Sequence, residues 1–131
     1  MDTIPPLSLP ILLDGATGSE LYKRGMPAGA CTEQWVLGHP EALLELQRDY
    51  VAAGSQVLIA PTFGANRVRL EQHGIFGQVA DYNRRLVELS RQAAGGRALV
   101  AGDMAPTGLF IAPFGESSFE ELVAIYTCLL Y

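Results

Sequence analysis

The stretch that decides the fold is Val57-Leu58-Ile59-Ala60, an apolar run, followed at once by Pro61-Thr62-Phe63-Gly64-Ala65-Asn66-Arg67. Two other apolar runs end in similar polar signatures: Ile11-Leu12-Leu13 before Asp14-Gly15-Ala16-Thr17-Gly18-Ser19-Glu20-Leu21, and Ala98-Leu99-Val100-Ala101 before Gly102-Asp103-Met104-Ala105-Pro106-Thr107-Gly108. Short apolar runs without polar alternation are typical of strands covered on both faces. The runs lie about 40 to 50 residues apart, which is the spacing of repeated βα units. We therefore expect parallel strands over 11–14, 56–60 and 98–102.

Helix signals fill the segments between these runs. Proline suits the first position of a helix, glycine suits its end, and a serine followed three residues later by glutamate favours a helix start. On these grounds we expect helices over 18–24, from Pro40 to near Gly54, over 78–94, and from Ser117-Ser118 onward. Trp35 and Tyr50 are interpreted as packing residues, and His39 and His73 as surface or capping residues.

The repeated units predict an α/β fold made of the first three βα units of a TIM (β/α)8 barrel, incomplete in this chain. A complete barrel takes about 250 residues, and the chain has 131. Residues 1–10, with three prolines, are expected to form an extended leader, and residues 11–131 the amino-terminal portion of the barrel. A short parallel sheet leaves open edges, so self-association through them is expected.

Bulk composition narrows the function classes. The net charge of -5 argues against a nucleic-acid binder, which needs a basic face. No apolar run reaches the length of a membrane span, and the first residues lack the basic region of a targeting signal. The two cysteines, Cys31 and Cys128, are too few for a disulfide framework. We expect a cytoplasmic protein with two free thiols.

Polar residues at the predicted strand ends are the candidates for chemistry, because ligands of parallel α/β sheets bind at that edge. Asp14 follows the first strand and is suited to accept hydrogen bonds from an ammonium group; a solvated turn carboxylate is the alternative. The turn at Thr17, Gly18 and Ser19 exposes N–H groups that favour an anion, or it is an ordinary helix cap.

The second and third strands carry further candidates. Thr62 and Asn66 follow the second strand, where a hydroxyl and an amide can hold a ligand or cap the next segment. Asp103 follows the third strand and is either a second acid of the site or a carboxylate that holds its own loop. No Ser/His/Asp order, paired-cysteine motif or GxGxxG fingerprint is present.

In their order and spacing these motifs, together with Gly54-Ser55 before the second strand, resemble the homocysteine S-methyltransferase family. The likeness is strongest to the amino-terminal, homocysteine-binding barrel of its cobalamin-dependent methionine synthase branch. The resemblance implies that homocysteine binds at the carboxyl face of the barrel. It also implies that a zinc ion activates the thiol, which then attacks a methyl donor: methylcobalamin, S-methylmethionine or a betaine.

The resemblance also implies roles for individual residues. Asp14 matches the aspartate that binds the substrate amino group, and Thr17 and Gly18 match the turn that holds its carboxylate. Thr62 matches a threonine of the site. Glu20, Asn66 and Asp103 belong to the motifs and are given supporting roles.

Several features depart from the family pattern. Pro61 stands where asparagine is common, and Ala105 where glycine is common. The family's zinc-binding cysteines lie in later Asn-Cys and Gly-Gly-Cys-Cys motifs, which this sequence lacks. Cys31 and Cys128 match neither motif, so no metal ligand and no catalytic residue is assigned. Cobalamin and folate would act through other domains.

The resemblance therefore predicts a fragment that carries part of the homocysteine site and is inactive alone. Two alternatives stay open: a non-catalytic small-molecule-binding or interaction module of partial-barrel fold, and a different barrel enzyme that uses the same strand-end acids.

Overall fold

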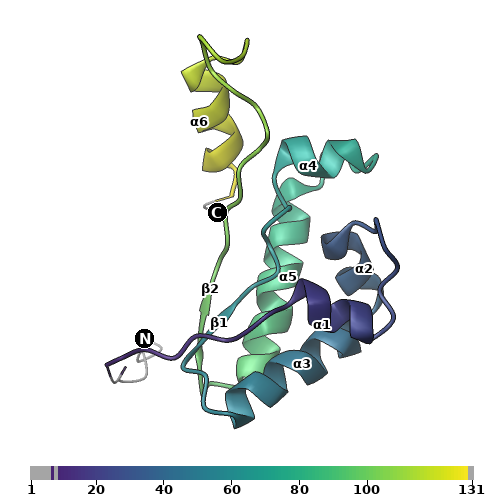
Figure 1. The fold of residues 1–131 in the computed structure, drawn as a ribbon, viewed down its shortest axis with the longest axis vertical. Helices are drawn as coiled ribbons and strands as arrows, with labels where there is room; N and C mark the ends of the chain where they lie inside the picture. The colour runs from purple at the N-terminus through teal and green to yellow at the C-terminus, as the bar shows by residue number, and fades with distance from the viewer. Residues whose placement is uncertain (1–6, 8, 130–131) are drawn as a thin grey trace.

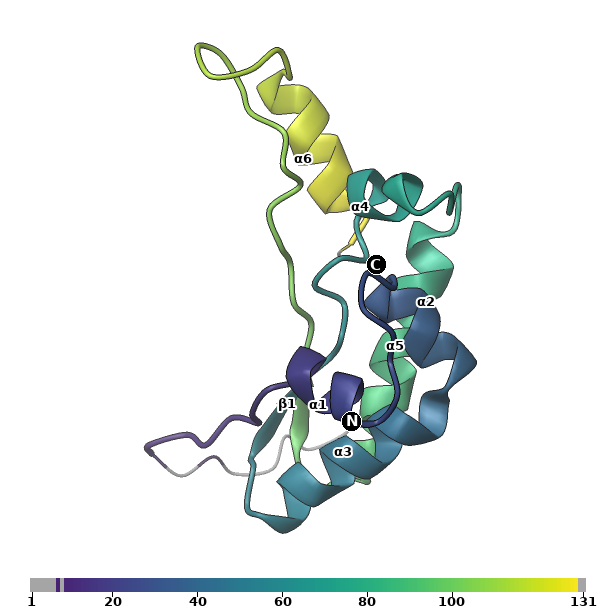
Figure 2. The same cartoon turned by 45° about the vertical axis from the view of Figure 1, so that its right-hand side comes forward.

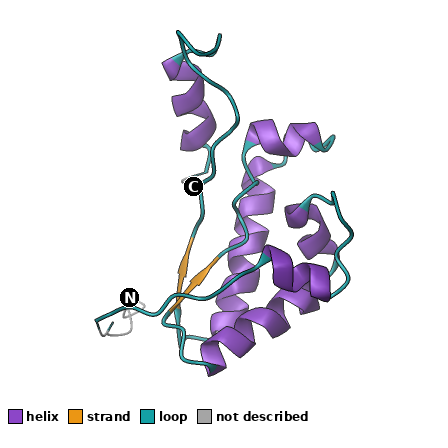
Figure 3. Cartoon of the chain, viewed as in Figure 1, coloured by secondary structure: helices purple, strands orange, loops and turns teal. Residues whose placement is uncertain are grey.

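The computed structural model describes Leu7 and residues 9–129, which form a mixed α/β fold (Figures 1 and 3). Along the chain the elements are α1 (Gly18–Lys23), α2 (Thr32–Gly38), α3 (Pro40–Ala52), β1 (Val57–Ile59), α4 (Arg67–Gln72), α5 (Val79–Ala94), β2 (Leu99–Ala101) and α6 (Phe119–Thr127).

The sheet is parallel, as predicted, but in the described part of the chain it has two regular strands instead of three. β1 and β2 pair in the register Val57↔Leu99, Leu58↔Val100 and Ile59↔Ala101. The predicted strands over 56–60 and 98–102 are therefore confirmed in slightly shorter form. Their parallel pairing brings the polar residues that follow each strand to the same edge.

The predicted strand over 11–14 is wrong in extent. Only Leu13 forms a parallel bridge, to Val57, and the N–H of Asp14 donates to the Val57 carbonyl at 3.0 Å. The N–H of Leu12 donates instead to the side chain of Gln56 at 3.0 Å. A side-chain acceptor thus takes the place of a backbone partner, and the ladder does not extend. The segment still lies beside β1 and delivers Asp14 to the end of that strand.

All four predicted helices are present. α1, α3 and α5 lie within one or two residues of their predicted bounds, and α5 ends at Gly95 with φ 54°, a left-handed conformation that favours glycine. The Ser118 side chain accepts a hydrogen bond from the N–H of Glu121 at the start of α6, as the serine–glutamate pattern predicts. The short helices α2 and α4 were not predicted, since six or seven residues carry little periodic signal.

The core lies between the sheet and the helices α3 and α5, which precede β1 and β2 in the chain. Leu44 and Val51 of α3, Leu58 of β1 and Ala93 of α5 share one buried cluster. A second cluster joins Leu21 of α1 to α2, α3 and α5. This packing makes a firm base under the carboxyl edge of β1. Beyond β2, α6 and the segment before it project away from that base (Figure 2).

The edges of the sheet and the exposed phenylalanines bear on the expectation of self-association. Within residues 9–129, β2 pairs with β1 alone, and Phe110, Phe114 and Phe119 are exposed. Self-association through the sheet edges stays a prediction.

None of the described helices combines the length and the hydropathy needed to cross a membrane.

Candidate functional site at the carboxyl edge of the sheet

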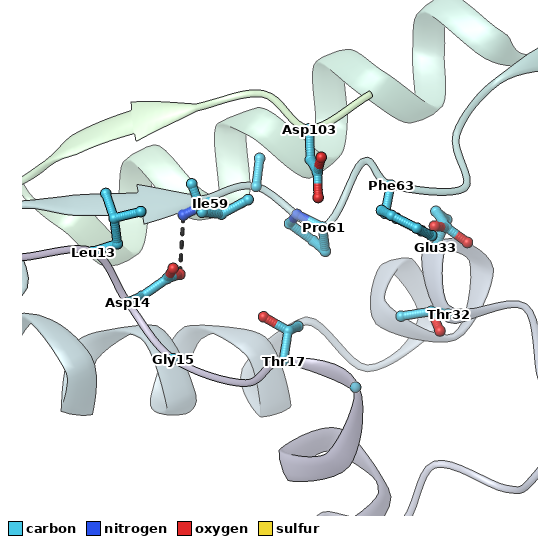
Figure 4. Close-up of a pocket in the computed structure, with 12 residues that line it drawn as sticks. Leu13, Asp14, Gly15, Thr17, Thr32, Glu33, Ile59, Pro61, Phe63 and Asp103 are labelled. Carbon is cyan, nitrogen blue, oxygen red and sulfur yellow. Dashed lines mark hydrogen bonds between the residues drawn. The ribbon is translucent and has the colours of Figure 1, made fainter. Parts of the chain in front are cut away.

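A cavity of about 440 Å³ opens at the carboxyl ends of the strands (Figure 4). The chain after Leu13 forms its first wall, and the chain after β1, the end of β2 and the start of α2 form its second wall. The lining residues are Leu13, Asp14, Gly15, Thr17, Gly18, Thr32, Glu33, Ile59, Ala60, Pro61, Phe63 and Asp103. Of the predicted site residues, Asp14, Thr17, Gly18 and Asp103 therefore meet here.

Asp14 is held against the end of β1. Its carboxylate oxygen Oδ2 accepts a hydrogen bond from the backbone N–H of Ile59 at 2.9 Å (Figure 4). Partial burial raises the pKa of Asp14 above its ordinary value, and the bond from Ile59 only partly offsets this effect. Asp14 lines the cavity, so its carboxylate is placed to accept from an ammonium group there.

The turn after Asp14 continues the same wall. Thr17 precedes α1 and makes no side-chain cap bond to it, so its hydroxyl is left to the cavity side seen in Figure 4. The first N–H groups of a helix have no partner inside the helix. An aspartate carboxylate and a turn with spare N–H groups are thus neighbours, which suits a ligand that carries both an ammonium and a carboxylate.

Tyr50 of α3 supports this turn from behind. Its hydroxyl donates to the Ala16 carbonyl at 2.8 Å. A Cβ atom on Gly15 would lie 2.8 Å from that hydroxyl oxygen and 2.9 Å from the ring atom Cε1. A side chain at position 15 would therefore displace the Tyr50 ring, and glycine permits the close approach. The interpretation of Tyr50 as a packing residue is confirmed but incomplete.

Thr62 has its side chain in the second wall, away from the cavity. It is 3% exposed. Its hydroxyl donates to the Asp103 carbonyl at 2.9 Å and accepts from the Asp103 N–H at 2.8 Å. Thr62 thereby ties the end of β1 to the end of β2 and leaves the Asp103 carboxylate at the cavity. Asn66 and Glu20 also lie outside the lining.

Asn66 and Glu20 perform local tasks. The side-chain oxygen of Asn66 accepts from the N–H of Arg69 at 3.0 Å and caps α4. Glu20 forms ion pairs with Lys23 and Arg24 on the surface of α1, and hydrogen bonds from these two side chains lower its pKa. The capping alternative for Asn66 is thus what the structure contains.

Glu33 is a residue of the second wall that sequence reasoning missed. It is 7% exposed, and its carboxylate accepts from the Gly64 N–H at 2.7 Å and from the Cys31 thiol at 3.4 Å. A Cβ atom on Gly64 would lie 2.7 Å from the Glu33 carboxylate. An acidic residue in the first turn of a helix normally lies at the surface, where it interacts favourably with the helix dipole. No local sequence signal therefore reveals that Glu33 is buried.

The described residues do not fit a zinc site. The Cys31 thiol is buried on Glu33, and burial raises its pKa, which disfavours the thiolate that binds metals. Cys128 is exposed at the end of α6. Over the described stretch no group of three His, Cys, Asp or Glu side chains is placed to hold a metal ion. We derive no chemical step through zinc.

Comparison with known proteins identifies the family of the chain. A family model described as homocysteine S-methyltransferase matches residues 11–130. Betaine–homocysteine S-methyltransferase 1 of Rattus norvegicus is 33% identical over 120 residues, covering 86% of this chain and 29% of that protein. S-methylmethionine–homocysteine S-methyltransferase BHMT2 of Pongo abelii is 34% identical over 114 residues, covering 86% and 30%. The chain thus spans less than a third of these relatives.

A solved structure shows the same fold. The metallated form of the homocysteine methyltransferase MmuM from Escherichia coli has a TM-score of 0.74 and 27% sequence identity, covering 92% of this chain and 48% of that one. The family match begins at Ile11, three residues before the aspartate of the cavity, and runs through every element of the fold. Because the family model matches residues 11–130 and the fold agrees, the chain belongs to the homocysteine S-methyltransferase family.

Proposed function

We propose that this chain supplies the part of a homocysteine S-methyltransferase, within a (β/α)8 barrel, that binds the amino-acid end of homocysteine. The observation that carries the proposal is that Asp14 and the Thr17–Gly18 turn line one cavity at the carboxyl edge of the sheet. A zwitterion needs an acceptor for its ammonium group beside donors for its carboxylate. The membership of the chain in the family supports homocysteine as that zwitterion.

Each residue then has a defined part in binding. The free oxygen of Asp14 accepts from the ammonium group, while Ile59 holds the other oxygen in place. N–H groups of the Thr17–Gly18 turn donate to the carboxylate. Leu13, Ile59 and Phe63 provide the apolar lining that suits the methylene groups. In the reaction the homocysteine sulfur bonds to the donor's methyl carbon, the bond from that carbon to the donor breaks, and the thiol proton is released.

The charge of the cavity bears on the methyl donor. Three carboxylates line it, from Asp14, Glu33 and Asp103, and none of the described residues that line it is Lys, Arg or His. The ammonium group of the substrate offsets only one of these three negative charges. The remaining negative charge favours a methyl donor that carries a positively charged group. The names of the relatives include betaine and S-methylmethionine, both of which carry an onium group. We therefore propose an onium donor; methylcobalamin, favoured by the sequence resemblance, is the alternative.

Calorimetric titration of L-homocysteine into the chain tests the binding proposal. We expect one saturable site, followed by binding of betaine or S-methylmethionine, and not of methylcobalamin, to the homocysteine-loaded chain. Mass spectrometry of the same mixtures reports methionine, which we expect to be absent because the described residues do not form a zinc site. Failure of homocysteine to bind would overturn the proposal, and binding of methylcobalamin alone would overturn the onium donor.

A further inference from the structure

We propose that Tyr50 is a positioning residue for the substrate carboxylate. Its hydroxyl holds the carbonyl of Ala16, and the N–H of Thr17, in the same peptide unit, is thereby aimed into the cavity. The inference rests on the proposed function, because it names how one half of the zwitterion is recognised. Tyr50 does not itself line the cavity, so it acts through the backbone.

The contact is well supported by its surroundings. Tyr50 belongs to α3 and packs against both buried clusters of the core, so its ring has a fixed base. The ring lies directly under Gly15, at the van der Waals limit that a Cβ would violate. The hydroxyl bond to Ala16 is 2.8 Å long. Tyr50, which is packed on the core, thus fixes the turn at two successive positions, Gly15 and Ala16.

Peptide geometry carries the effect to the other side of the turn. In a trans peptide the C=O and N–H groups point in opposite directions, and the Ala16–Thr17 bond is not among the cis bonds of the chain. A carbonyl drawn toward α3 therefore turns the Thr17 N–H away from α3. Thr17 and Gly18 line the cavity, and Figure 4 shows the Thr17 side chain on that side.

The hydroxyl is kept in its donor form. Burial, followed by the nearby carboxylates of Glu20 and Asp14, raises the pKa of Tyr50. The phenol therefore keeps its proton throughout the neutral range and can donate to Ala16 whenever a substrate is bound.

The test removes the hydroxyl alone and varies the ligand. Tyr50→Phe keeps the ring under Gly15 and deletes the bond to Ala16. Its matched control is Tyr126→Phe, which deletes another tyrosine–carbonyl bond, 3.0 Å long, from Tyr126 to Ala105, neither of which lines the cavity. Calorimetry compares L-homocysteine with 4-mercaptobutanoate, which lacks the amino group, and with 3-aminopropane-1-thiol, which lacks the carboxylate.

We expect Tyr50→Phe to weaken binding of L-homocysteine and 4-mercaptobutanoate by about threefold to tenfold, the range of one neutral hydrogen bond. Binding of 3-aminopropane-1-thiol should not change, and Tyr126→Phe should leave all three ligands unaffected. Equal weakening of all three ligands by Tyr50→Phe would show a merely structural bond, and unchanged affinities would show no role; either result overturns the inference. If the unaltered chain binds no homocysteine, the proposed function fails first, and the inference fails with it.

Discussion

The two walls of the cavity are built in opposite ways. In the first wall the motif's own side chains, Asp14 and Thr17, lie at the cavity, and the support comes from behind, from Tyr50 of α3. In the second wall the motif residues Thr62 and Asn66 are buried and bond to backbone groups. Polar residues that follow Leu13 and those that follow β1 are thus used differently: the first face the cavity, and the second hold backbone groups of the wall.

This contrast predicts how substitutions separate. A change at the cavity face of the first wall should alter affinity and spare stability. A change in the second wall should lower the free energy of unfolding. It should alter ligand affinity only through the resulting displacement of the backbone. The same contrast explains why Glu33 is buried, since it fixes the Gly64 backbone of the second wall.

The largest expected effect is on ligand affinity, from Asp14→Asn. The amide oxygen can still accept from Ile59, but the charge that attracts the ammonium group is gone. A hydrogen bond to a charged group contributes about 1.5–3 kcal/mol, so affinity for L-homocysteine should fall about tenfold to a hundredfold, as measured by calorimetry.

Asp49→Asn is the matched control, because it removes the same charge from a side chain that is exposed and lies outside the cavity. Thermal unfolding of Asp14→Asn should show no loss of stability, since the partly buried carboxylate is replaced by a neutral group. Unchanged affinity in a folded Asp14→Asn protein would return this residue to the role of a turn carboxylate.

The next effect is on stability, from Thr62→Val. Valine has the shape of threonine but leaves the Asp103 N–H and C=O without their hydroxyl partner. We expect the free energy of unfolding to fall by about 1–3 kcal/mol, the cost of unpaired buried polar groups, in a urea titration. Thr62→Ser keeps the hydroxyl and should recover most of the loss. A stable Thr62→Val protein with weakened homocysteine binding would place Thr62 in the binding site instead.

A third effect is on the pH dependence of binding. Burial raises the pKa of Asp14 above its ordinary 3.8, and the ammonium group needs the ionised form. Homocysteine affinity should therefore be constant at neutral pH and fall as the pH drops through this raised pKa, by about tenfold per unit below it.

The stability of the ligand-free chain should depend on pH in the opposite direction. The Asp14 contribution is present at low pH and is lost as the pH rises through the raised pKa, because the folded state holds the proton more tightly. Calorimetry and thermal unfolding across the acid range measure the two trends. In Asp14→Asn both Asp14-dependent trends should disappear; their persistence would assign them to another group.

The smallest effect is expected from Asn66→Ala in the second wall. Loss of the cap on α4 should lower the free energy of unfolding by about 1 kcal/mol and leave homocysteine affinity unchanged. Asn66→Asp keeps a capping oxygen and should retain most of the stability. A large fall in affinity with stability intact would reverse the comparison of the walls at this position.

Most of the secondary structure could be predicted from the sequence. Apolar runs followed by polar signatures located β1 and β2, and capping and glycine patterns located α1, α3, α5 and α6, because these signals are local. The strand over 11–14 was overextended because its ladder is interrupted by the Gln56 side chain, 44 residues away. Such a partner cannot be read from the strand itself.

The sequence by itself determined the alternation of strands and helices, the family, and most of the polar residues near the carboxyl edge of the sheet, though not Glu33. Only the tertiary structure decided which of them reach the cavity. Thr62 and Asp103 lie 41 residues apart and meet through two hydrogen bonds, while Tyr50 and Ala16 meet across 34 residues. Whether a polar side chain binds a ligand or a backbone group depends on such distant partners, which the parallel pairing of β1 with β2 and the packing of α3 bring into contact.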